Sequence, residues 1–114
     1  LLDLDIPFKG RAILYEGPVR DLCSLAPNNV NTMAAAAIAG HTLGFDKTIA
    51  RLEMDTEIQA HEVEVDVIGL NGFTQKTIRH NPASVGAVTG DATYASFLSS
   101  MLEAGGRGSG VHFC

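Results

Sequence analysis

The sequence predicts a mixed α/β domain, an α+β two-layer fold in which helices cover one face of an open, largely antiparallel sheet. Residues 61–67 alternate without a break between apolar and acidic side chains, which is typical of a half-buried strand. Residues 30–43 and 91–104 repeat apolar side chains at the spacing of an amphipathic helix. The predicted order of elements is β, α, α, β, β, β, α. Because the middle strands follow one another closely, they are expected to pair as antiparallel neighbours and to leave one face for the helices.

Two strands and a short helix are predicted around the first of these helices. The apolar run at residues 12–15 ends at a Gly-Pro turn and predicts a buried strand. Pro18 is well suited to the first position of a short helix that continues to Leu25, because its fixed φ suits a helix start. Residues 48–54 alternate imperfectly and predict a second strand.

The helix predicted at residues 30–43 is expected to be buried, since four consecutive alanines allow another backbone to approach closely. Its apolar stripe consists of Val30, Met33, Ala34, Ala37 and Ile38. Asn28 or Asn29 is expected to cap the helix, because an Asn side chain accepts hydrogen bonds from the free N–H groups of the first turn. Asn31 then lies in that turn with its carboxamide unused. These amides either hold a polar ligand at the helix start or only cap and turn the chain.

The second half of the chain is predicted to form a hairpin followed by a helix. His61 and three valines should occupy one face of the strand at 61–67, and Glu62, Glu64 and Asp66 the other. Residues 69–72 predict the turn, and 73–79 the returning strand. Lys76, Arg79 and Arg51 are expected to face the acidic row across the sheet. Asn81-Pro82 is expected to break the strand pattern before the helix at 91–104.

Composition excludes several classes of protein. A formal charge of −5 without a cluster of Lys and Arg argues against a nucleic-acid partner. Apolar runs stay well below the roughly 20 residues of a membrane span, so no membrane partner is expected. Cys23 and Cys114 lie far apart, which predicts neither a disulfide framework nor a metal site and is typical of a reducing, cytoplasmic compartment. The first residue is Leu1 instead of Met, which indicates a piece of a longer protein.

His61 is the strongest candidate for acid–base chemistry among the four histidines. It begins a strand and points to the same side as Val63, and an imidazole at the edge of an apolar face is suited to proton transfer near neutral pH. The alternative is a histidine that is merely hydrogen-bonded at a strand end. His41, His80 and His112 lie near a helix end, beside a proline and in the tail, and no histidine has a metal-binding spacing with another His or Cys.

Several motifs, in this order, together resemble the C-terminal domain of the L-aspartate dehydrogenase family. They are the segment Ala26-Pro27-Asn28-Asn29-Val30-Asn31, the alanine-rich helix, Asp55-Thr56 followed by the strand from His61, and Asn81-Pro82. The segments LYEGPVRD (14–21), NTMAAAA (31–37) and GAVTG (86–90) look especially similar to the animal branch of the family. The resemblance extends from about residue 12 to residue 114.

The resemblance implies an NAD- or NADP-dependent dehydrogenase that oxidises L-aspartate to iminoaspartate, which hydrolyses to oxaloacetate and ammonia. The active-site histidine of the family matches His61, and its cofactor-binding asparagine best matches Asn31, with Asn29 as second choice. The fold implied is similar to the C-terminal domain of glyceraldehyde-3-phosphate dehydrogenase-like enzymes. Residues 1–114 are then one catalytic and oligomerisation domain, and the N-terminal Rossmann domain that binds most of the dinucleotide is absent from this chain.

Two functions follow as expectations. The first is the catalytic half of an aspartate dehydrogenase, expected to form a homodimer and to be inactive as this fragment alone. The second is a non-catalytic dimerisation or partner-binding domain of an inactive relative, for which the row Glu62, Glu64 and Asp66 offers a docking face.

Overall fold

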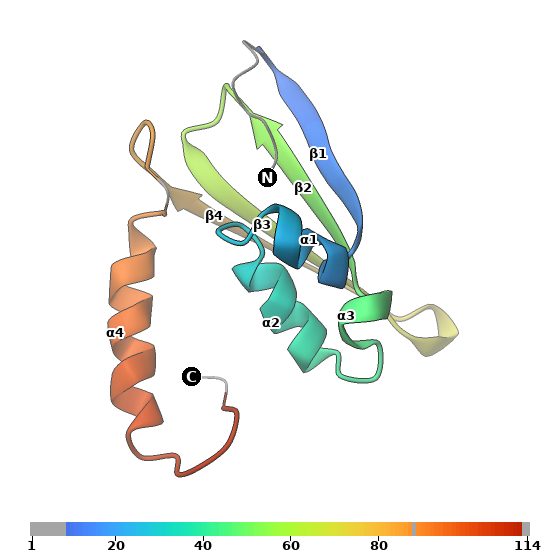
Figure 1. Cartoon of the computed structure of the whole chain (residues 1–114), viewed down its shortest axis with the longest axis vertical. Helices are drawn as coiled ribbons and strands as arrows, with labels where there is room; N and C mark the ends of the chain where they lie inside the picture. Colours follow the sequence, from blue (N-terminus) through green and yellow to red (C-terminus); the bar gives the residue numbers. More distant parts are fainter. Residues whose placement is uncertain (1–8, 88, 113–114) are drawn as a thin grey trace. The chain divides into compact units, whose positions relative to one another are not determined.

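The computed structural model describes residues 9–87 and 89–112. The described residues contain four strands and four α-helices, so the predicted antiparallel α/β class is confirmed. The strands form two antiparallel pairs, β1 with β2 and β3 with β4 (Figure 1). The expected pairing of neighbouring middle strands is therefore confirmed for β3 with β4 but wrong for β2 with β3. The chain divides into two compact units, one ending at Ile58 and one beginning at Gln59, and each is described by itself below.

The first unit is built on β1 (Arg11–Pro18) and β2 (Ile49–Asp55). The two strands pair antiparallel from Arg11 opposite Asp55 to Pro18 opposite Ile49, with an irregularity between Ile13 and Tyr15. Both strands were predicted: β1 is longer than the predicted run 12–15, and β2 begins and ends one residue later than the predicted strand 48–54.

Three helices lie between these strands in sequence: α1 (Val19–Leu25), α2 (Asn31–Ala39) and the single turn α3 (Gly44–Lys47). Pro18 stands just before α1, as its N-cap, and the Tyr15 hydroxyl donates a hydrogen bond of 2.6 Å to its carbonyl oxygen. Burial raises the pKa of Tyr15, and the nearby carboxylate of Asp21 adds to the effect.

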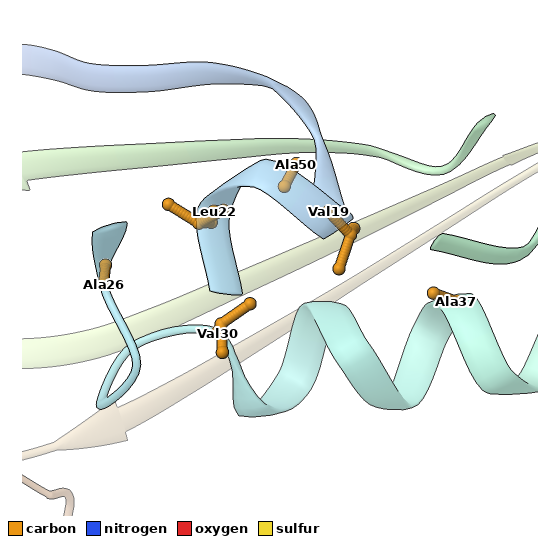
Figure 2. Packing of buried hydrophobic residues seen from close by; sticks show 6 residues of the cluster. All are labelled: Val19, Leu22, Ala26, Val30, Ala37 and Ala50. Atoms are coloured by element: carbon orange, nitrogen blue, oxygen red, sulfur yellow. The ribbon is translucent and has the colours of Figure 1, made fainter. Parts of the chain in front are cut away.

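The core of the first unit is small and comes from α1, α2, the turn between them and β2 (Figure 2). Val19 and Leu22 are fully buried, because α1 lies against the strand pair on one side and α2 on the other. The remaining core residues are Ala26, Val30, Ala37 and Ala50. The expected burial of the alanine-rich helix is confirmed only in part, because Ala37 is the buried residue of α2 whereas Ala35 and Ile38 are exposed.

The predicted asparagine cap of α2 is wrong. Val30 occupies the N-cap position, and no side chain caps the helix. The reason is a turn that closes earlier, since the Asn29 N–H donates to the carbonyl of Ala26 at 3.0 Å and leaves Asn28 and Asn29 outside the helix. The helix also ends at Ala39 instead of continuing to Leu43, and α3 begins separately at Gly44.

The second unit is a hairpin followed by a helix. Its strands β3 (Ala60–Ile68) and β4 (Thr74–Pro82) pair in regular antiparallel register, and the short 3-10 turn η1 (Leu70–Gly72) connects them. Asn71 and Gly72 both have positive φ there, the left-handed conformation in which Asn and Gly are enriched. The expected break at Asn81-Pro82 is wrong: both residues belong to β4, and Pro82 is its last residue, where a missing N–H is tolerated.

The carboxylates of the acidic row each have a contact from the returning strand. Lys76 contacts Glu64 at 2.7 Å and Asp66 at 3.5 Å, and His80 contacts Glu62 at 2.7 Å. The hydrogen bond to Glu64, with the charge of Asp66 nearby, raises the pKa of Lys76. The expected pairing is therefore confirmed for Lys76.

The expected pairing is wrong for the two arginines. Arg79 is paired with Val63 in the register and lies on the other face of the hairpin. Arg51 belongs to β2 of the first unit, where it forms ion pairs with Glu16 and Glu53. Lys76 and Arg79 are three residues apart, so the alternation of the strand places them on opposite faces. The partners of Arg51 depend on the pairing of β1 with β2, which composition does not reveal.

The last helix, α4 (Ala92–Ala104), coincides with the predicted one. Its apolar stripe is exposed, with relative exposures between 57% and 75% for Tyr94, Phe97, Leu98, Met101 and Leu102. Of the helices that the structure describes, none is long and apolar enough to cross a membrane.

Candidate active site

His61 is the second residue of β3 and is half-buried, whereas His41, His80 and His112 are exposed. Its side chain lies on the same face of the hairpin as the half-buried Val63, as the alternation predicted. Within the described part of the chain its imidazole has no hydrogen-bond or ion-pair partner. Such an imidazole is free to bind a ligand and to exchange a proton with it.

Asn81 lies directly opposite His61 in the register, so the two side chains share one face. It is 7% exposed and is the buried polar residue of the described chain. Its Oδ1 accepts a hydrogen bond from the Ala92 N–H, in the first turn of α4, at 3.2 Å. The carboxamide therefore joins the end of the hairpin to the start of α4 at the position of the histidine.

Gly90 lies directly against the carboxamide of Asn81, and no side chain fits at this position. A Cβ atom on Gly90 would lie 2.8 Å from Asn81 Oδ1 and closer still to Cγ and Nδ2 of the same carboxamide. The Asp91 N–H also donates to the carbonyl of Pro82 at 3.1 Å. The backbone of residues 90–92 is thus held against the strand end that carries Asn81.

Asn31 and Asn29 lie in the first unit, and both are exposed. Since Val30 is the N-cap and no side chain caps α2, the carboxamide of Asn31 is not used by the helix, although it lies in its first turn. A carboxamide offers both a donor and an acceptor, which matches the amide of a nicotinamide ring. These residues therefore fit a nicotinamide contact chemically.

Sequence reasoning missed Asn81 as a member of the His61 face. The signal was present, because the alternation from Gln75 through Thr77 and Arg79 continues to position 81. Pro82 had been taken as the end of the pattern, but a proline at a strand terminus does not interrupt the residues before it. Among the residues that the structure describes, no group of three His, Cys, Asp or Glu side chains is arranged to hold a metal ion.

A mixed α/β fold with antiparallel strands, an unpartnered half-buried histidine and unused carboxamides fits the C-terminal domain of a dehydrogenase. Comparison with known proteins makes this specific. The family model described as "Aspartate dehydrogenase, C-terminal" matches residues 2–100, and the chain belongs to this family. The resemblance found in the sequence is therefore confirmed.

Relatives in animals and in an archaeon agree with this assignment. The chain is 56% identical over 107 residues to an "Aspartate dehydrogenase domain-containing protein" of Danio rerio, covering 93% of this chain and 39% of that protein. It is 52% identical over 111 residues to the protein of the same name from Xenopus tropicalis, covering 91% and 39%. An "L-aspartate dehydrogenase" of Methanococcoides burtonii is 30% identical over 102 residues, covering 90% and 36%. No solved structure gives a significant match.

The chain therefore spans about two-fifths of the length of these relatives, with 39% in the two animal proteins.

Proposed function

We propose that this chain is the catalytic and substrate-binding half of an L-aspartate dehydrogenase. The reaction removes a hydride from Cα of L-aspartate and gives iminoaspartate, which water converts to oxaloacetate and ammonia. The observation that carries the proposal is the half-buried, unpartnered imidazole of His61, in a chain of the aspartate dehydrogenase family. An N-terminal Rossmann domain, outside residues 1–114, would bind most of the dinucleotide, so this chain alone would be inactive.

His61 is the acid–base group in this proposal. The substrate ammonium must lose a proton before Cα can give up its hydride, and a neutral imidazole accepts that proton. When water later attacks the imine carbon, a second proton must move from the water to the departing nitrogen. Once the imidazolium has released the first proton to solvent, the same imidazole can take a proton from the attacking water and return it to the nitrogen, which leaves as ammonia.

Asn31 is the proposed cofactor contact, and Asn29 the second choice. The donor and acceptor of one carboxamide pair with those of the nicotinamide carboxamide and so fix which ring carbon faces the substrate. NAD or NADP, when bound, supplies the hydride acceptor. The choice between them is expected to lie in the dinucleotide-binding domain.

The most direct test is an assay of the full-length protein with a panel of amino acids and either dinucleotide. We expect reduction of NAD or NADP with L-aspartate and at least about 10-fold lower kcat/KM with L-alanine, because a site built for a second carboxylate discriminates against substrates that lack it. Failure of every amino acid to reduce a dinucleotide that the protein binds would contradict the proposal.

The second candidate function is a non-catalytic dimerisation domain of an inactive relative, which the exposed apolar stripe of α4 favours. The same stripe supports a homodimer for the active enzyme as well. The acidic row is a poorer docking face, because Lys76 and His80 already contact its carboxylates. The cytoplasmic location remains a prediction from cysteine content.

The apolar stripe of α4 gives a prediction about assembly. Phe97→Asp should shift the protein from dimer to monomer in sedimentation analysis, since burying a charge in an apolar contact is strongly unfavourable. Ser99→Asp places the same charge on the same helix outside the stripe and should leave the dimer intact. A dimer that persists in the Phe97 variant would contradict a role for α4. A dimeric protein with no activity toward amino acids would favour the second candidate function.

A further inference from the structure

The face of the hairpin that carries His61 also carries a cation. Arg79 lies opposite Val63, and Asn81 lies opposite His61. Arg79 is therefore the diagonal neighbour of His61 on the same face of an antiparallel pair. Such neighbours have Cα atoms about 7–8 Å apart and remain within reach of long side chains.

Arg79 differs from the other cations of its unit. Lys76 is held by Glu64 and Asp66 on the opposite face, and Arg107 forms an ion pair with Glu103 of α4. In the described residues Arg79 has no ion pair, and its side chain is exposed. The second unit thus directs one uncommitted guanidinium to the same side of the strands as its uncommitted imidazole.

A guanidinium beside a proton-transferring imidazole suits a substrate that carries carboxylates. Its planar donors bind a carboxylate with two parallel hydrogen bonds, which fixes orientation as well as supplying charge. L-Aspartate needs two such partners, one for each carboxylate. Glu62, Glu64 and Asp66, which would repel the substrate, all lie on the opposite face.

We propose that Arg79 binds a carboxylate of the dicarboxylic substrate and so positions its reacting carbon and nitrogen at His61. This inference rests on the proposed function, because it names the substrate ligand of the same site. Asn81 supports it as a positioning residue. Its hydrogen bond from the Ala92 N–H fixes the end of β4, which pairs with the part of β3 that carries His61.

The test compares Arg79→Gln, Arg79→Lys and the control Lys76→Gln in the full-length protein. Lys76 lies three residues away on the same strand, but on the opposite face. We expect Arg79→Gln to lower kcat/KM for L-aspartate by about 10- to 100-fold, which is the loss expected when a hydrogen bond to a charged group is removed. The loss should appear mainly as a higher KM for L-aspartate, with the KM for the dinucleotide unchanged. Arg79→Lys should recover part of the loss, because it restores the charge without the planar fork, and Lys76→Gln should stay within about 2-fold of the wild type.

A binding measurement separates this inference from the proposed function. Succinate has two carboxylates and no amino group, and its binding can be followed by the rise in melting temperature of each variant. Stabilisation of the wild type and Lys76→Gln, but not of Arg79→Gln, supports the carboxylate site even if no amino acid is oxidised. If the wild type oxidises L-aspartate and Arg79→Gln does so equally well, the inference is overturned while the proposed function stands. Absence of both aspartate oxidation and succinate stabilisation overturns both.

Discussion

Asn81 and Gly90 illustrate how single residues determine the candidate site. A buried carboxamide needs a partner, and the first turn of α4 provides one in the Ala92 N–H. That arrangement leaves no room for a side chain at position 90. The junction next to His61 therefore depends on one residue being Asn and another being Gly.

The close fit at Gly90 gives a stability prediction. Gly90→Ala should lower the free energy of unfolding by about 1–3 kcal/mol, the usual cost of overpacking. In the background of Asn81→Ala, where the carboxamide is gone, the same change should cost clearly less. Urea denaturation of the two single variants and the double variant measures this coupling.

A glycine without such a neighbour provides the control. Gly105 has helical φ, and a Cβ there would lie 3.6 Å from the carbonyl oxygen of Leu102, an ordinary van der Waals contact. Gly105→Ala should therefore change stability by less than about 0.5 kcal/mol. Equal costs for Gly90→Ala with and without Asn81 would show that the carboxamide is not what excludes a side chain at position 90.

Helices and strands were predicted largely by their own periodicity. The alternation around His61 and the helical spacing around Phe97 are local signals, and β3 and α4 appear where they indicate. The N-cap of α2 was missed because the Asn29 N–H completes a turn with Ala26 before the helix begins. Local propensity predicted a capping Asn, whereas Val30 is the N-cap and no side chain caps the helix.

Pairing between distant strands was the harder part. β1 and β2 lie on either side of three helices, and no local signal sets their register. The contact of Arg51 with Glu16 follows from this register, which is why it could not be assigned from sequence. His61 was predicted as a site residue. Alternation along the returning strand also indicates that Arg79 and Asn81 share a face, but which residues of β3 they lie opposite required the register of the hairpin.

The helix α1 gives a prediction about the core. Leu22 is fully buried between the strand pair and α2, so Leu22→Ala should cost about 2–5 kcal/mol of stability. Leu25→Ala makes the same chemical change three residues later, where the side chain is 36% exposed, and should cost less than about 1 kcal/mol. Urea unfolding of both variants measures the difference. Similar losses of stability in the two variants would contradict the assignment of Leu22 to the core of the first unit.

The described chain buries few apolar side chains and exposes many large ones. Its buried cluster lies in the first unit, whereas α4 of the second unit presents five large apolar side chains to solvent. The chain also spans only about two-fifths of the length of its animal relatives, 39% in each. The exposed apolar stripe of α4 is the observation behind the dimer proposed above.

The central claim for the whole molecule is that His61 transfers the protons of aspartate oxidation. The measurement is kcat/KM for L-aspartate in the full-length protein carrying His61→Ala, with His80→Ala as the control on the opposite face of the same hairpin. We predict a loss of at least about 100-fold for His61→Ala, the lower end for a general acid–base group, and a change within about 2-fold for His80→Ala. A His61→Ala protein that keeps most of its activity with L-aspartate would contradict the account.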